Sequence, residues 1–326
     1  MWMKSKRLVM FSLFAALAGL AVFVTGTEAQ PGTLKQVLPG VWFREGEIKE
    51  MGHSNNVIIE MKDYLVVVDA NFPSGAHAVI RDMKKVSPKP VKYVFITHHH
   101  GDHIYGIPVW TRLGATTIAY KAVNEELKKY EPKRWQEAQG RKDIAELKLS
   151  SPEPVQQSFE KIPYVIDDGS RRVEFWHFGW AHTRGDSFAY LPQEQALVTG
   201  DAIVDGAYNY TGDGHISNWP NVIRAARTKL KVKQVLPGHG GPGGPSMMTG
   251  QEQFFLELLK AVKSAMAQNK KLEDIVQMQG DKAVSTSIKL PASVNNWVGG
   301  SLPNQVKETY EELKAGRPHG EIPAGK

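Results

Sequence analysis

The chain has 326 residues, with 40 lysines and arginines against 34 aspartates and glutamates, and it contains no cysteine. The missing cysteines exclude disulfides, thiolate zinc ligands and a lipid-modified N-terminal cysteine. The net charge of +6 is modest, and the basic residues are spread along the chain. This spread is typical of a solvated surface and disfavours a nucleic-acid-binding track. The length suits one large core domain with an added segment.

The first 29 residues have the pattern of a secretory signal peptide. A basic start, residues 1–7, precedes an almost wholly apolar run at 8–24, and small residues up to Ala29 offer a cleavage site. We therefore expect cleavage before Gln30 and a periplasmic or secreted protein. The apolar run is somewhat long, so an uncleaved N-terminal membrane anchor stays open as the alternative.

Beyond this leader, strands alternate with helices, which predicts an α/β fold. Strands are expected at 33–45, 55–69, 92–96, 116–120, 171–178, 187–191, 196–199 and 234–236. Helices are expected from about residue 104 and at 74–85, 121–148, 218–229, 252–269, 271–280 and 303–315. The Lys-, Glu- and Ala-rich segment 121–148 is expected to form a surface hairpin of helices, with a lid over a site as the alternative. We assign a core domain to 30–265 and a C-terminal helical extension and tail to 266–326.

Four side chains that can bind metals follow one predicted strand. The apolar run 91–96 leads directly to His98, His100, Asp102 and His103. Side chains at i and i+2 share one face of an extended segment but not of a helix, so His98 and His100 can bind one ion together. Asp102 and His103 follow a glycine turn and can reach a second ion. Imidazole and carboxylate are ligands that zinc and similar divalent metals take.

Three later segments each place one His or Asp in a glycine-marked turn after a predicted strand. These candidate ligands are His182, Asp201 and His239. Each residue alone could be an ordinary turn or surface residue. Together with the first motif they make four ligand-bearing strand ends, and ligands from separate strands can converge at one edge of a sheet sandwich.

These motifs resemble those of the metallo-β-lactamase superfamily. The matching runs are His-x-His-x-Asp-His at 98–103, His-Thr-x-Gly-Asp at 182–186, Thr-Gly-Asp at 199–201 and Pro-Gly-His-Gly at 237–240. The resemblance extends over residues 36–265 and implies a four-layer αββα sandwich with metals at one edge, followed here by the C-terminal helical extension.

The resemblance also implies two zinc ions, with iron or manganese open as the native metal. The first ion would be held by His98, His100 and His182. The second would be held by Asp102, His103 and His239. Asp201 would bridge the two ions.

With this ligand set we expect a metal-dependent hydrolase, in which a metal-bound hydroxide attacks a carbonyl. Asp102 and Asp201 are the predicted catalytic residues, since Asp201 would keep the ions close and Asp102 would orient the hydroxide. Asp69 and Thr183 are candidates for fixing the orientation of the metal-binding imidazoles.

Aromatic residues near the motifs are the candidate walls of a substrate cleft. The loop 205–215 follows Asp201 closely and is expected to border the cleft. The predicted substrate contacts are Tyr208, His215 and Trp110, and further candidates are Phe72, Trp180, Tyr210 and Trp219. We expect a small-molecule substrate, no nucleic-acid partner and, after signal cleavage, no membrane partner. The sequence does not predict the oligomeric state.

Three functions compete. The first is an exported zinc hydrolase of small lactams, lactones or esters. Many lactamases of the family have Cys or Ser where Asp201 stands, and the Cys type places a carboxylate-binding Lys at the position of Val204, which argues against true β-lactamase activity. The second is a glyoxalase II-like thioesterase, which Asp201 fits but export from the cytoplasm disfavours. The third is an iron-binding oxidoreductase or a non-hydrolytic metal-binding periplasmic protein.

Overall fold

The computed structural model of the protein describes residues 31–322. The predicted signal peptide at 1–29 and its cleavage site before Gln30 lie outside the described residues. Across 31–322, no helix combines the length and the apolar character that crossing a membrane requires.

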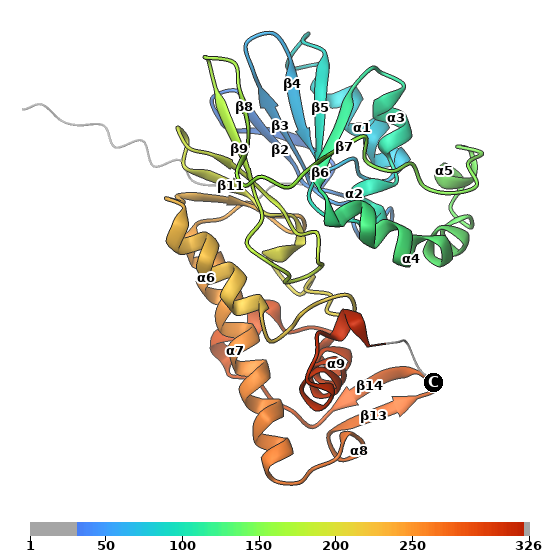
Figure 1. Ribbon diagram of the computed structural model, residues 1–326, viewed down its shortest axis with the longest axis vertical. Helices are drawn as coiled ribbons and strands as arrows, with labels where there is room; N and C mark the ends of the chain where they lie inside the picture. Colours follow the sequence, from blue (N-terminus) through green and yellow to red (C-terminus); the bar gives the residue numbers. More distant parts are fainter. Residues whose placement is uncertain (1–30, 323–326) are drawn as a thin grey trace, which may run out of the picture.

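A seven-stranded sheet forms the N-terminal half, with its strands side by side in chain order (Figure 1). The strands are β1 (Leu34–Leu38), β2 (Val41–Arg44), β3 (Asn56–Glu60), β4 (Leu65–Val68), β5 (Val91–Ile96), β6 (Thr116–Tyr120) and β7 (Gln157–Phe159). Strands β1 to β4 pair antiparallel, and β4 to β7 pair parallel. Every residue of the apolar strand β4 is buried, as expected for a strand covered on both faces.

A second sheet of five strands packs against the first. In spatial order it contains β12 (Gln234–Leu236), β11 (Ala196–Val198), β10 (Phe188–Leu191), β9 (Arg172–Trp176) and β8 (Tyr164–Asp167). The two sheets share one apolar core, in which the rings of Phe95 and Phe175 stack with their centres 4.1 Å apart. The sequence did not predict β7 and β8, which are short and lie at the edges of their sheets.

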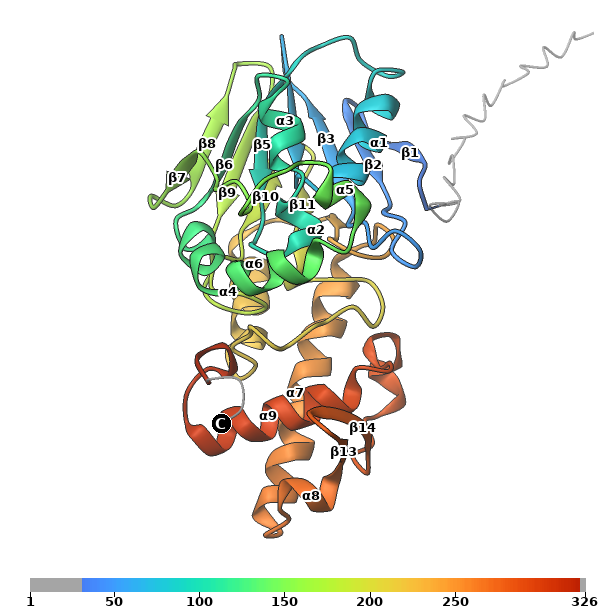
Figure 2. The same ribbon diagram turned by 90° about the vertical axis from the view of Figure 1, so that its right-hand side faces the viewer.

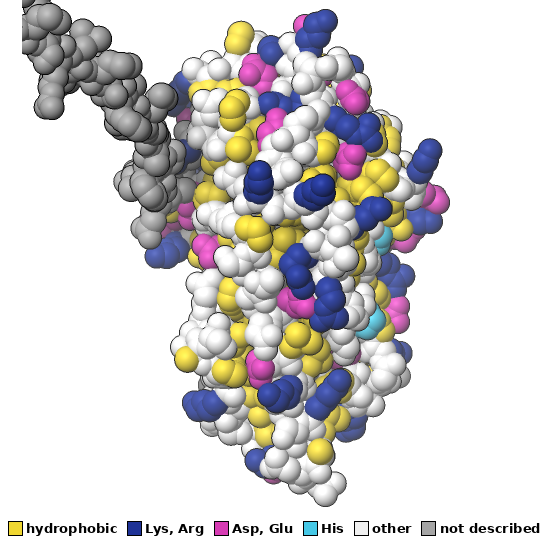
Figure 3. Space-filling view, turned by 90° about the vertical axis from the view of Figure 1, so that its left-hand side faces the viewer, with side chains coloured by type: hydrophobic (Ala, Val, Ile, Leu, Met, Phe, Trp, Pro, Cys, Tyr) yellow, Lys and Arg dark blue, Asp and Glu magenta, His cyan; other side chains and the backbone are white. Residues whose placement is uncertain are grey.

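Helices cover both outer faces of this sandwich (Figure 1). Over the larger sheet lie α1 (Pro73–Met83), α2 (Gly101–Ile104), α3 (Ile107–Thr111), α4 (Ala122–Ala138) and α5 (Lys142–Ala145). Over the smaller sheet lie α6 (Trp219–Lys229) and α7 (Pro245–Ala267). The predicted αββα sandwich is therefore confirmed. On the side of α6 and α7, Lys and Arg side chains are interspersed with acidic and apolar ones (Figure 3).

The remaining chain, residues 268–322, forms what we call the C-terminal unit, which lies beyond one end of the sandwich (Figure 2). Its elements are α8 (Leu272–Ile275), β13 (Val276–Gln279), β14 (Lys282–Thr286), and then η2 (Ala292–Trp297), α9 (Leu302–Ala315) and η3 (His319–Glu321). The long helix α7 runs from the sandwich into this unit, and the predicted boundary at residue 265 falls in its last turn.

The prediction of a helix over 271–280 was wrong. Only 272–275 is helical, and the chain then forms the hairpin of β13 and β14. The physical reason is the two-residue turn at Gly280, whose φ of 59° lies in the left-handed region that such hairpin turns require. The predicted helix at 303–315 is confirmed as α9.

Candidate metal centre

Seven His and Asp side chains gather at one edge of the sandwich, where strand ends of both sheets meet. They are His98, His100, Asp102, His103, His182, Asp201 and His239. Two of them lie between β5 and α2, two lie in α2, one lies between β9 and β10, one lies in the 3-10 turn η1 (Gly200–Ala202) after β11, and one follows β12. The candidate ligands chosen from the sequence therefore converge in space.

The first cluster consists of three imidazoles and one carboxylate whose ligand atoms lie within 4.8 Å of one another. His182 Nε2 is 2.9 Å from His100 Nδ1 and 3.7 Å from Asp201 Oδ2. His98 Nε2 is 3.9 Å from the same oxygen, and it is buried without a hydrogen-bond partner. A buried nitrogen that faces other lone-pair donors fits a bound cation better than it fits a protein hydrogen bond.

The second cluster contains Asp102, His103 and His239. His239 Nε2 lies 3.1 Å from Asp102 Oδ2, and His103 Nε2 lies 3.4 Å from that oxygen. Asp201 reaches this cluster as well, at 3.3 Å from each imidazole. Gly238 permits this approach, because a Cβ there would lie 2.1 Å from Asp201 Oδ1.

The electrostatics around Asp201 and the second cluster favour positive charge. Burial alone would raise the pKa of Asp201, but the imidazoles of His239 and His103 hold it well below its usual value. Conversely, burial would lower the pKa of His239, but the carboxylates of Asp201 and Asp102 raise it to about 9. A divalent cation at this place would satisfy the same carboxylates and displace these protons. In the first cluster, burial lowers the pKa of His182 to about 3, which leaves its lone pair free at neutral pH.

Four of the imidazoles are held through their second ring nitrogen by an oxygen atom. The pairs are His98 Nδ1 with Thr97 Oγ1 at 3.0 Å, His103 Nδ1 with Asp69 Oδ2 at 2.7 Å, His182 Nδ1 with Tyr210 O at 2.8 Å, and His100 Nε2 with Asp213 Oδ2 at 2.9 Å. Such partners fix the orientation of metal-binding histidines. Asp69 therefore lies where the sequence placed it. Thr183 does not, because its hydroxyl donates to Asp186 and contacts no imidazole.

Sequence reasoning missed two residues that support His100. Asp213 is 3% exposed, and it accepts two hydrogen bonds from Arg134 of α4, at 2.6 and 2.8 Å. His99, His100 and Asp213 form a third group of possible metal ligands, but the guanidinium already occupies both carboxylate oxygens. Asp213 lies in the loop that the sequence singled out, whereas nothing in the sequence linked that loop to Arg134, 79 residues earlier.

Comparisons with known proteins agree with this geometry. The model of the Metallo-beta-lactamase superfamily matches residues 51–239, more than half of the chain. The chain belongs to the metallo-beta-lactamase superfamily. It is accordingly a metal-dependent hydrolase.

The superfamily relatives are distant in sequence. The type 2 metallo-beta-lactamases of Bacillus sp. (strain 170) and Bacillus cereus are each 25% identical over 214 residues, which cover 64% of this chain and 73% of the relative. A metallo-beta-lactamase structure from Pontibacter korlensis superimposes with a TM-score of 0.56 at 21% identity, over 68% of this chain and 98% of that one. One from Hirschia baltica gives 0.55 at 20% identity, over 69% and 98%. The structural likenesses show the shared fold.

A cavity of about 340 Å³ opens onto the metal centre of this superfamily member. Its lining includes Asp102, Asp201 and His239 together with Ile48, Arg134, Tyr208 and Tyr210. The predicted contact Tyr208 is thus at the cavity, with its ring centre 5.5 Å from that of His239. The segment 121–148, predicted to form a helical hairpin or a lid, contributes Arg134 of α4 to the lining of this cavity.

Two of the predicted substrate contacts lie elsewhere. Trp110 is a completely buried residue of α3, and its indole N–H donates to Ala70 O, so the prediction that it touches substrate was wrong. His215 is not among the residues that line the cavity, and its ring packs against Trp180 instead. The loop turns away from the cavity between Tyr210 and His215, because His215 N–H is tied to Ala181 O.

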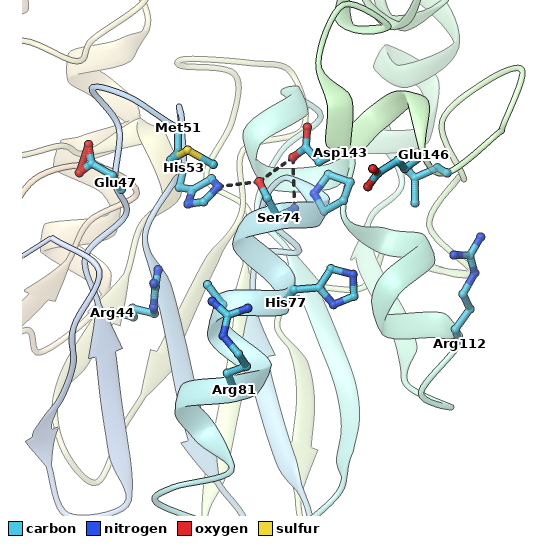
Figure 4. Close-up of a pocket in the computed structure, with 13 residues that line it drawn as sticks. Arg44, Glu47, Met51, His53, Ser74, His77, Arg81, Arg112, Asp143 and Glu146 are labelled. Carbon is cyan, nitrogen blue, oxygen red and sulfur yellow. Dashed lines mark hydrogen bonds between the residues drawn. The ribbon is translucent and has the colours of Figure 1, made fainter.

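A second cavity, of about 590 Å³, lies between α1, α5 and the loop that precedes β3 (Figure 4). Ser74 lies there between Asp143 Oδ2, at 2.6 Å, and His53 Nε2, at 2.8 Å. Ser74 donates its hydroxyl proton to the carboxylate, so His53 cannot act as its base. Burial and the nearby Arg44 also lower the pKa of His53 to about 4. This arrangement is therefore not a serine-nucleophile site, and the hydrolytic chemistry belongs to the metal centre.

Proposed function

We propose that this protein is an exported zinc-dependent hydrolase that cleaves the carbonyl bond of a small lactam, lactone or ester. One observation carries the proposal. The buried carboxylate of Asp201 lies between two sets of three candidate ligands, within 3.3 Å of His239 Nε2 and 3.7 Å of His182 Nε2. One acidic side chain shared by two nitrogen-rich clusters is suited to a pair of divalent ions.

Zinc is the ion that the donor set favours. The candidate ligands are imidazole nitrogens and carboxylate oxygens, and the chain offers no thiolate. Two such ions would lower the pKa of a bound water towards neutrality and polarise the substrate carbonyl.

Several side chains of the protein have separate roles in the proposed reaction. Asp201 keeps the two clusters together. Asp102 is 22% exposed on the cavity side, so its carboxylate can accept a hydrogen bond from the attacking water and orient it. Tyr208 and Tyr210 form apolar walls for the substrate, and Asp69 and Asp213 hold His103 and His100 in place.

The cavity favours esters and lactones over β-lactams. Val204, at the position where some family lactamases carry a carboxylate-binding Lys, is wholly buried, and its N–H donates to Gln251. The one positively charged Lys or Arg side chain among the described residues that line this cavity is Arg134, and its charge is already paired with Asp213. A thioesterase of the glyoxalase II type remains the second candidate, because it shares the aspartate at 201. We base export on the sequence of residues 1–29 alone.

Metal analysis of the mature protein, combined with a substrate panel, tests this function. The panel contains nitrocefin, a lactone, a thioester and a phosphodiester. We expect about two zinc ions per chain and hydrolysis of the lactone, with both His100→Ala and Asp102→Ala inactive but folded by circular dichroism. An active protein free of metal would contradict the proposal, iron in place of zinc would favour the oxidoreductase, and thioester turnover alone would favour the second candidate.

Replacing Tyr208 by alanine should change substrate preference without removing metal. Its ring borders the cavity beside His239, and a pocket contact of this kind shifts kcat/KM between two substrates by about 10- to 200-fold. Steady-state kinetics on two esters of different size give the ratio. His215→Ala is the matched control, because its ring packs on Trp180 away from the cavity. An equal loss on both esters would place Tyr208 outside the substrate contacts.

A further inference from the structure

The loop that carries Tyr208, Tyr210 and Asp213 has no regular structure of its own. Between η1 and α6, residues 203–218 contain neither helix nor strand. Irregular segments of this length inside a compact fold are uncommon and are usually functional. The conformation of this loop must therefore be fixed by contacts from other parts of the chain.

Many of these contacts come from the C-terminal unit. Helix α9 supplies Gln305, whose side-chain N–H donates to Asn209 O at 2.7 Å, and Glu308, which accepts a hydrogen bond from Thr211. The buried carboxylate of Glu312 accepts hydrogen bonds from the backbone N–H groups of Ile216 and Ser217, at 2.8 and 2.6 Å. These contacts hold the loop on both sides of Asp213.

The turn η3 of the C-terminal unit packs against the loop at Asp213 itself. Gly320 N–H donates to Gly214 O at 3.0 Å, and the side chains of Lys129 and Tyr130 on α4 donate to Gly320 O. A Cβ at residue 320 would lie 2.5 Å from Asp213 O and 2.8 Å from a ring carbon of Trp180. The backbone of Gly320 thus lies between Asp213 and α4 and contacts both. Arg134, which pairs with Asp213, is on the same helix.

We propose that the C-terminal unit is a positioning part of the metal centre: by packing Gly320 on Asp213 and binding the loop through Glu312, it fixes the carboxylate that orients His100. Figures 1 and 2 show α4 and α2 at the edge of the sandwich that faces this unit. The family match ends at residue 239, so this support comes from outside the matched region. The inference rests on the proposed metal-binding role of His100.

Zinc titration of the metal-stripped, full mature chain in competition with a chromophoric chelator tests the proposal. In Gly320→Ala, the added methyl group must displace Asp213 or η3. We expect the affinity of the first cluster for zinc to fall about 10- to 100-fold, the usual effect of losing an outer partner of a ligand histidine, while the second cluster is unchanged. Reference titrations of His98→Ala and His239→Ala assign the two binding steps to the two clusters.

Gly300→Ala is the matched control, because a Cβ at this exposed glycine of the same unit meets nothing within 4 Å. Both of its binding steps should equal those of the natural protein. Glu312→Gln keeps the shape of the side chain but weakens it as a hydrogen-bond acceptor. It should lower the zinc affinity of the first cluster by a smaller factor, and it replaces Gly320→Ala as the test variant if that protein does not fold.

The outcomes separate this inference from the proposed function. Unchanged zinc affinity in Gly320→Ala and Glu312→Gln would overturn the positioning role, as would an equal weakening of both clusters, which would indicate general destabilisation. A natural protein that binds no zinc would overturn the proposed function itself.

Discussion

Replacing Asp201 by alanine is expected to remove metal from both clusters and to inactivate the enzyme. The carboxylate lies 3.3 Å from His103 and His239 and 3.7 Å from His182, so it is an acidic side chain that both clusters share. The loss in kcat/KM should exceed the roughly 10- to 100-fold that removal of an outer hydrogen-bond partner causes. Elemental analysis and kinetics on the purified variant measure the two effects.

Asp167→Ala provides the control for that experiment. Asp167 lies at the end of β8, where its side chain is 44% exposed and pairs with Arg172. Both metal content and turnover should be unaffected in this variant. If Asp201→Ala retained two ions and normal turnover, Asp201 would be a turn residue and the shared-carboxylate mechanism would be wrong.

Stripping the metal with a chelator is expected to abolish activity and to lower the midpoint of thermal unfolding. Each ion present at a hundred times its Kd stabilises the native state by about 2.7 kcal/mol, provided that it does not bind the unfolded chain. Without cations, buried atoms such as His98 Nε2 and His103 Nε2 make no hydrogen bond, which adds a desolvation cost. Melting curves of the native, stripped and zinc-restored protein give the shift.

Zinc should restore both the midpoint and the activity, whereas magnesium, which prefers oxygen ligands in octahedral geometry, should restore neither. Identical melting curves before and after stripping would show that the native protein does not depend on a bound ion. Recovery with ferrous iron but not with zinc would transfer the assignment to the oxidoreductase alternative.

The candidate ligands were predictable because their signal is local. Each follows an apolar strand and lies in or next to a turn that contains glycine. Because strand ends meet at one edge of a sandwich, the assumption of that fold is enough to predict that these ligands lie close together. His98 and His100 lie two residues apart on an extended segment, and that spacing determines that they face the same side. Asp69 was predictable for the same reason, since it directly follows the buried strand β4.

Asp213 and Arg134 could not be predicted because their roles depend on tertiary contacts. Arg134 lies on a charged helix where most side chains face solvent, and nothing in its neighbours distinguishes it. Trp110 shows the converse error, because proximity in sequence to the metal motif suggested a cleft wall, whereas its ring fills the core under α3. Pattern alone does not tell which face of a short helix is buried.

The fold was predictable except where elements are short. Strand β7 has three residues, Gln157–Phe159, of which two are exposed, so it carries no alternation of polar and apolar residues. The two strands of the β13 and β14 hairpin contain only nine residues, and their burial does not alternate, so Gly280 was the one clear sequence signal for the hairpin. Long amphipathic segments such as α7 gave the strongest predictions, although α7 starts seven residues earlier than expected.

Helix α7 also bears on where this polypeptide can be shortened. Its buried residues Phe254, Phe255 and Leu258 share one apolar cluster with α6, with the smaller sheet and with Val306 of α9. A protein truncated at residue 239, where the match to the superfamily model ends, would keep every candidate ligand but would lose α7, whose buried side chains pack in one apolar cluster with those of α6. The stretch of chain that matches the family model is therefore shorter than the stretch that must fold together, and the bounds of that match are a poor guide to designing a minimal active fragment of this enzyme.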